Sequence, residues 1–336
     1  MLCKKYWIFV VDDNTWPEHQ KASIAAINKP PTEAGRQSAI AEIIGVRPGD
    51  YIFFNIRASE DHPPQIIGLY EATTEPYYDP TPLFDGAKYI GENLSYNLPY
   101  RVAFKQVINF PEPIDVDEIW CLKDRGLIWS IQQSRGDAVG VHACTCITKF
   151  EGELILKLLE ANNPVKGALK TYPPPPPLSQ RQPLPINLST DPEGNLHYED
   201  ALKAFILKGL AHGKFKEILG DYDDYIPNMP TGARKEIDIL LLKYSETNVI
   251  WYQILELKKD SFSMKEMQRL IEYEKWFRET RALSPIQVHP VAIAYDFENV
   301  KNYVKRRTDY DKRRIRLLRY QYDSAHNEIT FFDETF

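Results

Sequence analysis

The chain has 336 residues, 43% of them hydrophobic and 26% charged, with a formal net charge of -6. This length predicts two domains, and the apolar content excludes a disordered polyelectrolyte. The acidic balance is not that of a uniformly basic nucleic-acid binder. The apolar run at Tyr6–Val11 is too short to span a bilayer, no signal peptide precedes it, and the four cysteines show no paired spacing. We therefore expect a cytoplasmic protein without a membrane partner.

The N-terminal half alternates short β-rich runs with helical stretches, separated by turn signals. The predicted strands are Tyr6–Val11, Asp50–Ile56, Gln65–Thr73 and Tyr100–Phe110. The predicted helices are Glu18–Ile27, Arg36–Ile44 and Glu151–Ala161. This order predicts an α+β domain built on a small mixed β-barrel.

A proline-rich segment divides the chain. Five consecutive prolines, Pro173–Pro177, favour extended polyproline II structure within the run Tyr172–Gly194. The segment could also be a ligand for an aromatic-lined recognition domain, but its place between two patterned halves favours a semi-rigid linker. We expect a first domain at 1–162, a linker at 163–194 and a second domain at 195–336.

The C-terminal half has a different order of elements. Helices are expected at Asp200–Leu219, Ser263–Thr280 and Glu298–Arg307. Near-continuous apolar strands are expected at 235–244, 249–259 and 288–295, and a hairpin follows them at the end of the chain. Helices alternating with such strands predict an α/β domain with a mixed sheet flanked by helices.

Two of these apolar strands carry charged residues. Asp238 precedes four apolar residues, and Glu256 and Lys258 interrupt the next strand on one face, since side chains alternate between faces. Buried charges need partners or a metal. Two carboxylates can hold Mg²⁺, which activates water for phosphodiester hydrolysis, while an ammonium stabilises developing negative charge.

The segment from Tyr198 to about Tyr273 resembles the core of PD-(D/E)XK nucleases. The residues that match the first acid and the E-x-K element of this family are Asp238, Glu256, Leu257 and Lys258. The resemblance implies that Asp238 and Glu256 bind the metal, Mg²⁺ with Mn²⁺ as an alternative. It also implies that Glu199, on the opening helix, is a further metal ligand or its orienter, and that Gln268 belongs to the catalytic set.

Other interpretations stay open for these charges. Asp238 could sit at a strand entry, with Glu256 and Lys258 forming an ordinary ion pair, and Glu217 is an alternative to Glu199 as the helical acid. Arg234 and Lys235 could contact the DNA backbone. A basic stretch, which could also be a solvated helix face, includes the backbone candidates Arg306 and Arg307; it consists of Lys301, Lys305, Arg306, Arg307, Lys312, Arg313, Arg314, Arg316 and Arg319.

The N-terminal half resembles the EVE domains of the PUA-like group, relatives of YTH readers, over roughly Lys5–Leu159. Four segments carry the resemblance: IAEIIGVRPGDYIFFNI, IIGLYEATTEPYYDPTPLFD, YRVAFKQVINFPEPIDVDEI and SIQQSRGDAVGVHACTCITKFEGELILKLL. The resemblance implies that a flipped or single-stranded modified base is held in an aromatic pocket, where stacking and edge contacts replace those lost on flipping. The candidate base-binding residues are Trp16, Asn55, Ser59, Phe84, Tyr89 and Tyr96. Trp7 is expected to pack in the core.

Together these features predict a modification-dependent, Mg²⁺-dependent DNA endonuclease of the restriction type. Its partner would be double-stranded DNA carrying a modified base, and cleavage of both strands would require a homodimer or paired recruitment. One alternative is a mismatch- or structure-specific DNA endonuclease. Another is a non-catalytic nucleic-acid-binding protein whose nuclease fold is structural.

Overall fold

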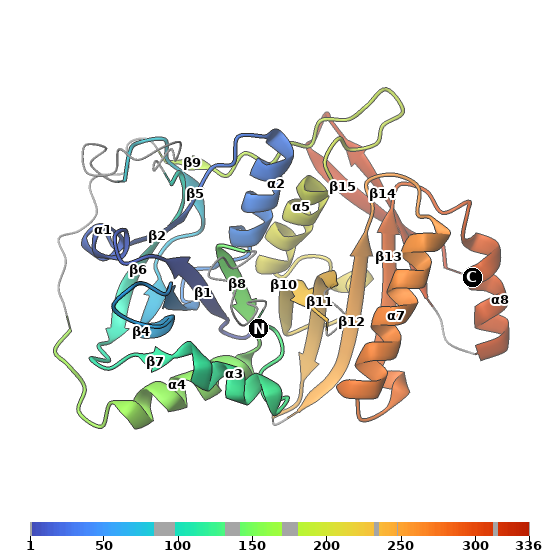
Figure 1. The fold of residues 1–336 in the computed structure, drawn as a ribbon. Coiled ribbons are helices and arrows are strands. Elements are labelled where there is room, and N and C mark those ends of the chain that lie inside the picture. Colours follow the sequence, from blue (N-terminus) through green and yellow to red (C-terminus); the bar gives the residue numbers. More distant parts are fainter. Residues whose placement is uncertain are drawn as a thin grey trace. The chain divides into compact units, whose positions relative to one another are not determined.

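The computed structural model describes residues 2–83, 98–131, 142–169, 181–231, 235–246, 248–311 and 315–335. Its contacts divide the chain into two compact units. One unit is Cys3–Pro185, and the other is Ile186–Phe336 together with Met1–Leu2. They are called here the N-terminal unit and the C-terminal unit, and Figure 1 shows the elements of each.

The N-terminal unit is built on a mixed sheet. Its strands are β1 (Tyr6–Val11), β2 (Ile24–Ile27), β3 (Tyr51–Ile56), β4 (Gln65–Ala72), β5 (Tyr77–Tyr78), β6 (Tyr100–Ile108), β7 (Ile114–Asp115), β8 (Cys144–Ile147) and β9 (Gln182–Pro183). They pair in the order β8-β1-β3-β4-β6-β5-β9, while β2 joins β6 and β7 joins β4. β1 and β3 are parallel, whereas β3, β4 and β6 are successively antiparallel. No pairing among the described strands closes this path into the expected barrel.

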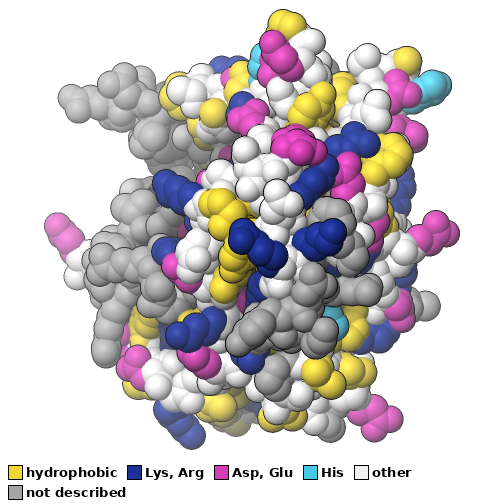
Figure 2. Space-filling view, turned by 90° about the vertical axis from the view of Figure 1, so that its right-hand side faces the viewer, with side chains coloured by type: hydrophobic (Ala, Val, Ile, Leu, Met, Phe, Trp, Pro, Cys, Tyr) yellow, Lys and Arg dark blue, Asp and Glu magenta, His cyan; other side chains and the backbone are white. Residues whose placement is uncertain are grey.

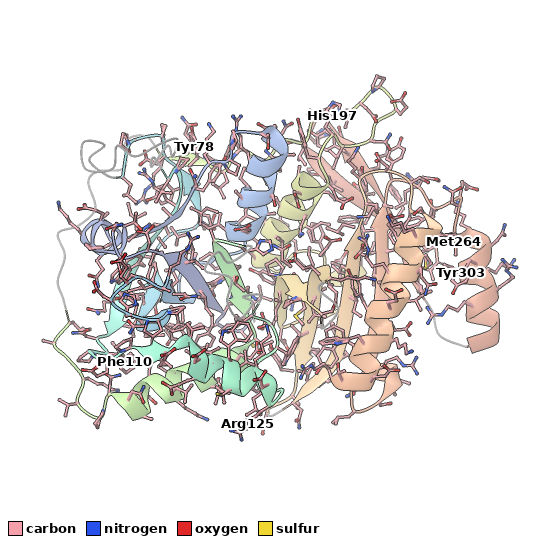
Figure 3. The ribbon with its side chains drawn as sticks, viewed as in Figure 1. Tyr78, Phe110, Arg125, His197, Met264 and Tyr303 are labelled. Atoms are coloured by element: carbon pink, nitrogen blue, oxygen red, sulfur yellow. The ribbon has the colours of Figure 1, made fainter. Side chains whose placement is uncertain are left out.

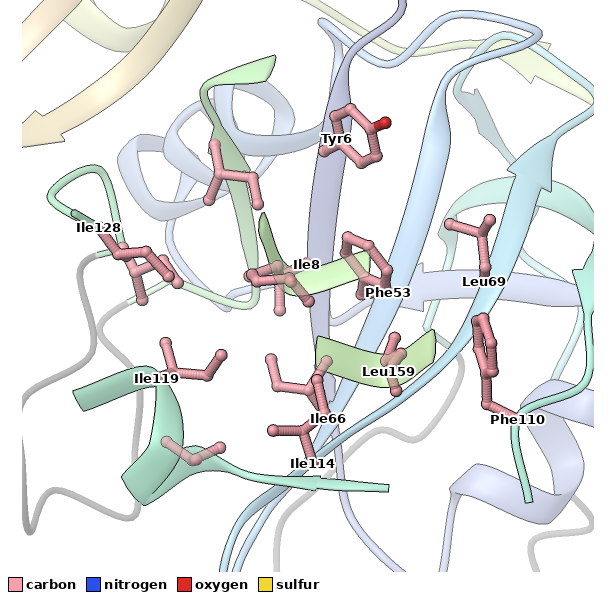
Figure 4. Close-up of a cluster of buried hydrophobic side chains, with 14 residues drawn as sticks. Tyr6, Ile8, Phe53, Ile66, Leu69, Phe110, Ile114, Ile119, Ile128 and Leu159 are labelled. Atoms are coloured by element: carbon pink, nitrogen blue, oxygen red, sulfur yellow. The ribbon is translucent and has the colours of Figure 1, made fainter. Parts of the chain in front are cut away.

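Helices cover this sheet and complete its core. They are α1 (Trp16–Ala22), α2 (Glu33–Ile43), α3 (Val116–Asp124) and α4 (Lys149–Asn162). α4 starts with a capping box between Thr148 and Glu151, which satisfies orphan amides of its first turn. Figure 4 shows an apolar cluster in which Ile8 and Phe53 of the sheet meet Ile119 of α3 and Leu159 of α4. Trp7 is fully buried, as expected.

One expected helix is wrong in its second half. The stretch Glu18–Ile27 is helical only to Ala22, because Ser23 adopts a left-handed conformation with a φ of 54°. The following apolar residues, Ile24–Ile27, pair with β6 as strand β2. Sequence periodicity could not predict this change, because β2 is stabilised by pairing with β6, a strand that is distant in the chain.

Part of the proline-rich stretch packs on the N-terminal unit. Strand β9 pairs with β5, and Gln37 of α2 donates a hydrogen bond to the Pro185 carbonyl at 3.2 Å. Gly167 forms a bridge with Asn109. Residues on either side of 170–180, a range that includes Pro173–Pro177 and lies outside the described residues, therefore belong to this unit.

The C-terminal unit contains the second mixed sheet. Its strands are β10 (Asp224–Pro230), β11 (Glu236–Tyr244), β12 (Val249–Leu257), β13 (Val288–Ala294), β14 (Arg316–Asp323) and β15 (Glu328–Asp333), paired in chain order. β11 is antiparallel to both β10 and β12, whereas β12, β13 and β14 run parallel to one another. β14 and β15 form the expected terminal hairpin. The sheet is therefore mixed, as predicted.

Helices α5 (Glu199–Ala211), α6 (Lys216–Leu219), α7 (Met264–Thr280) and α8 (Lys301–Asp311) belong to this unit, with a short 3-10 turn, η2 (Pro285–Gln287). α7 provides the crossover that the parallel pair β12 and β13 requires, and it packs against both strands (Figure 1). Met264 begins α7 and Tyr303 lies on α8 (Figure 3).

The expected helix Asp200–Leu219 is divided into α5 and α6. Gly213 and Phe215 between them have φ angles of 70° and 66°, which end a right-handed helix. Within the described parts of both units, none of the helices is apolar over a length sufficient to cross a membrane.

Candidate functional site

The two predicted acids of the C-terminal unit lie on neighbouring strands. In the antiparallel register, Ile239 of β11 pairs with Leu255 of β12, so one further step sets Asp238 opposite Glu256. Residues opposite each other on antiparallel strands project to the same face. The Leu257 amide donates a hydrogen bond to Asp238 Oδ2 at 2.8 Å, which fixes this carboxylate across the strand pair. The sheet thus brings both acids to one place.

Lys258 pairs with Glu199, the acid of helix α5. Its Nζ atom lies 2.6 Å from Glu199 Oε1 and 2.7 Å from the Leu257 carbonyl oxygen. Glu199 occupies the first turn of α5, where the helix dipole favours a carboxylate. Lys258 therefore forms its ion pair with Glu199 and not with Glu256, which was the alternative interpretation.

Glu256 takes its cation from α7. Arg269 Nη1 lies 3.2 Å from Glu256 Oε1, and Glu256 is 1% exposed. The predicted residue on this helix, Gln268, is exposed, one position away from the residue that faces the site. Sequence matching missed Arg269 because the direction of the helix face depends on how α7 packs on the sheet.

A second lysine, Lys203, also belongs to the cluster, and it was not predicted from the sequence. Lys203 of α5 is buried, and its Nζ atom lies 3.3 Å from Asp238 Oδ1 and 3.8 Å from Asp200 Oδ1. Its place four residues after Glu199 sets both side chains on one face of α5, which is a spacing that could have indicated it. The site cluster therefore comprises Glu199, Lys203, Asp238, Glu256, Lys258 and Arg269.

The charges in the site cluster shift one another's pKa values. Burial, followed by the nearby Asp238, raises the pKa of Glu256 to about 8, against the opposing effects of Lys258 and Arg269. Burial likewise raises the pKa of Glu199. For both Lys203 and Lys258, burial acts to lower the pKa, but Asp238 and other carboxylates outweigh it and raise the pKa. The carboxyl groups of Glu199 and Glu256 therefore tend toward neutrality, while the ammonium groups of Lys203 and Lys258 stay charged.

The donor set suits a hard divalent cation that keeps several waters. Within the described residues, Glu256 Oε2 is buried and has no hydrogen-bond partner. This acceptor beside the Asp238 carboxylate is therefore available to a ligand. No group of three or more His, Cys, Asp or Glu side chains in the described part of the chain is arranged to hold a metal. Mg²⁺ is commonly bound through only one or two carboxylates plus waters, so Asp238 and Glu256 would be sufficient ligands.

The remaining C-terminal candidates lie apart from these contacts. Glu217 is exposed on α6, and Arg234 lies outside the described residues. Lys235 pairs with Glu272 of α7. The Arg307 side chain is only 8% exposed and pairs with buried Glu274.

Exposed cations nevertheless remain on α8, where Lys305 and Arg306 face solvent. Figure 2 views the side of the C-terminal unit that carries α8 and shows Lys and Arg side chains interspersed with Asp and Glu. Lys301 pairs with Glu298 and Glu334, and Arg319 pairs with Glu334. Among the described residues of the basic stretch, Lys301, Arg307, Arg316 and Arg319 are therefore paired with carboxylates, and 312–314 lie outside the described residues.

The candidate base-binding residues of the N-terminal unit are distributed over two faces of the sheet. Trp16 packs on Phe54 and Tyr70, with ring centroids 4.5 Å and 5.8 Å apart. Asn55 follows Phe54 on β3, so its side chain projects to the opposite face of the sheet. Phe53 projects to that same face, where it belongs to the apolar cluster of Figure 4. Trp16 and Asn55 thus do not line a single wall, and Phe84, Tyr89 and Tyr96 lie outside the described residues.

Ser59 lies in an exposed loop after β3, close to the loop that follows β1. Because β1 and β3 are parallel, both loops leave the same edge of the sheet. His62 Nε2 lies 2.8 Å from Asp13 Oδ1 and so joins the two loops, and the hydrogen bonds of the His62 ring to the Pro63 carbonyl and to Asp13 raise the pKa of His62. This polar pair was not predicted, since loop residues show no periodicity that could reveal it.

The N-terminal unit is therefore an α+β domain of mixed sheet and helices with two polar loops at one edge. Residues 5–157 match the sequence model of the EVE domain family, so this part of the chain is an EVE domain of the PUA-like group. A curated relative, the UPF0310 protein PH1033 of Pyrococcus horikoshii, is 28% identical over 119 residues, which cover 34% of this chain and 69% of the relative.

Solved structures also resemble part of the chain. A hypothetical protein from Leishmania major is 15% identical with a TM-score of 0.35, covering 47% of this chain and 96% of its own. The human THYN1 protein, solved in complex with DNA containing 5-methylcytosine, is 14% identical with a TM-score of 0.31, covering 47% of this chain and 98% of its own.

Proposed function

We propose that the protein is a modification-dependent DNA endonuclease, in which the EVE domain holds a modified base and the C-terminal unit hydrolyses a phosphodiester bond with Mg²⁺. The observation that carries the proposal is the convergence of Asp238, Glu256 and Lys258, with Glu199, at adjoining strand and helix ends. The order of helix α5, three antiparallel strands, helix α7 and parallel strand β13 supports a PD-(D/E)XK core.

Four residues of the site cluster have a chemical role in this proposal. Asp238 and Glu256 would hold the metal, which supplies Lewis-acid polarisation and a more acidic bound water. Lys258 presents a charged ammonium that can donate a hydrogen bond to a phosphoryl oxygen or to the attacking water. Glu199 positions that ammonium through its 2.6 Å hydrogen bond. The exposed Lys305 and Arg306 would contact the DNA backbone.

The EVE domain would supply the selectivity. A base removed from the stack is bound by aromatic faces and read by polar groups at its edge. Because THYN1 was solved with DNA containing 5-methylcytosine, that base is the first modification to test. We further propose that two copies act together, since the described part of each chain contains one site cluster and cleavage of a duplex needs two cuts.

The direct test is cleavage of duplexes that differ in one base. Plasmids carrying 5-methylcytosine, other cytosine or adenine modifications, a mismatch or no modification would be incubated with the full chain and Mg²⁺. We expect cutting only of a modified substrate, and loss of about 10³-fold or more in rate for Asp238→Asn. Asp221→Asn, which alters an exposed acid of the same unit, is the matched control. Cutting of plain DNA alone would refute the reader assignment.

A non-catalytic DNA-binding protein is the second candidate, and one specific observation favours it. Every carboxylate of the site cluster already has a cationic partner: Glu199 with Lys258, Asp238 with Lys203, and Glu256 with Arg269. Such a network can serve structure alone. Under this alternative, no substrate is cut, and Asp238→Asn alters stability or DNA binding rather than a cleavage rate. A mismatch-specific endonuclease would instead cut the mismatched duplex.

A further inference from the structure

Helix α5 and the strand pair β11 and β12 exchange charges in both directions. Glu199 of the helix binds Lys258 after β12, while Lys203 of the helix binds Asp238 of β11. Glu199 and Lys203 are one helical turn apart on the same face of α5. The helix thus provides an anion to the lysine of the proposed nuclease site and a cation to its acid.

Lys203 is enclosed more completely than an ordinary salt-bridge lysine. Its side chain is 9% exposed, whereas Asp200, its second partner, is 37% exposed. A buried ammonium is costly unless carboxylates compensate for the lost water. Asp238 provides the closer compensation, at 3.3 Å, so Lys203 and Asp238 hold each other within the protein.

The position of Lys203 has a consequence for a divalent ion. Asp238 Oδ2 accepts a hydrogen bond from the Leu257 amide, and Asp238 Oδ1 accepts one from Lys203. An ion bound by Asp238 would have to share this carboxylate with a resident ammonium, and two cations in a partly desolvated site repel each other strongly. Arg269 is farther from Asp238 in the hydrogen-bond network, since its partner is Glu256.

We infer that Lys203 is a resident counter-cation of Asp238, which keeps this carboxylate in place without metal and limits the affinity of the site for a divalent ion. The inference rests on the proposed nuclease site. It predicts that removal of the Lys203 charge strengthens metal binding, because the Leu257 amide still orients Asp238 while the repulsion is gone. A purely structural lysine would have the opposite or no effect on metal affinity.

The test is binding of Mn²⁺ to the full-length protein without DNA, followed by calorimetry or by the free-ion electron paramagnetic resonance signal. We expect Lys203→Met to lower the dissociation constant by roughly tenfold. Lys203→Arg retains the charge and should keep the wild-type affinity. Lys208→Met is the matched control, because Lys208 is an exposed lysine on the same helix.

The outcomes separate this inference from the proposed function. Wild-type binding that disappears in Asp238→Asn, with equal or weaker binding in a folded Lys203→Met variant, would overturn the counter-cation role and leave the nuclease site intact. Failure of both the wild type and a folded Lys203→Met variant to bind Mn²⁺ would overturn both. If Lys203→Met does not fold, Lys203→Gln takes its place, since its amide can still donate a hydrogen bond to Asp238, and the same tighter binding is expected.

Discussion

The two units of this protein bury charge in different ways. In the N-terminal unit, Arg101 is 2% exposed and binds the Asp79 carboxylate at 3.1 Å, the Leu98 carbonyl at 2.9 Å and the Thr81 carbonyl. Glu151 of the same unit accepts hydrogen bonds from Ser130 and Thr148. These charges anchor the backbone of loops and of a helix start.

In the C-terminal unit, the buried and half-buried charges of the site cluster face one another. Glu199, Asp238 and Glu256 come from three elements, and each is met by a side-chain cation. Among the described residues, one oxygen of Glu256 is left without a partner. A buried charge that is satisfied by backbone groups therefore serves stability. A cluster of charges in which one carboxylate oxygen has no hydrogen-bond partner is instead suited to bind a ligand.

The largest expected effect is on catalysis. Lys258→Met should reduce Mg²⁺-dependent cleavage of modified DNA by on the order of 10² to 10³-fold, because the site loses its charged donor to the phosphate. The partly exposed Glu199 can then be hydrated, so the free energy of unfolding should change little. Lys259→Met is the control, since the Lys259 side chain pairs with Asp260. A similar loss of cleavage in that control would indicate a general charge effect.

The reverse pattern is expected for the buried arginine of the N-terminal unit. Arg101→Met should lower the free energy of unfolding of that unit by about 3 to 5 kcal/mol, because Asp79 would remain buried without its cation. Differential scanning calorimetry of the full chain measures this change. Arg36→Met, at a half-exposed pair with Glu33, should cost less than about 1 kcal/mol. Equal effects of the two variants would contradict a specific anchoring role for Arg101.

The stability of the N-terminal unit should also depend on pH through His19. Burial lowers the pKa of His19 to about 4, from an ordinary value of 6.5, although it bonds the Ile24 carbonyl. The folded state therefore binds fewer protons than the unfolded state between these values, and stability falls as the pH drops from 6.5 to 4. The total loss is roughly 3 kcal/mol.

His19→Gln retains an N–H donor but does not titrate, so it should remove most of this loss in urea unfolding at several pH values. His62→Gln is the matched control, because the pKa of His62 is raised rather than lowered. An unchanged acid sensitivity in His19→Gln would show that other groups cause it.

The smallest expected effect on stability is that of substitutions at two buried glutamates. Glu256→Gln should stabilise the C-terminal unit by roughly 1 to 2 kcal/mol while abolishing cleavage, as often occurs at functional sites. The pKa of Glu256 is raised to about 8, so the wild-type unit loses stability as the pH rises from the ordinary value toward 8, and the variant should lack this loss.

Glu151→Gln should instead destabilise the N-terminal unit, because a neutral amide cannot accept all the hydrogen bonds that Glu151 accepts from Ser130 and Thr148. Thermal unfolding at pH 7 and pH 9 would compare both variants with the wild type. Stabilisation by both substitutions, or by neither, would remove the distinction between anchoring charge and site charge.

The sequence alone determined the long apolar strands, the helices α2, α4 and α7, and the acids Asp238 and Glu256. Strand alternation and the segments typical of an EVE domain are local features, so they can be read without coordinates. Only the tertiary structure decided that Lys203 and Arg269 complete the site, that Lys258 pairs with Glu199, and that Trp16 and Asn55 face opposite ways. These outcomes depend on how a helix is rotated against a sheet and on which strands pair, and contacts between distant segments set both.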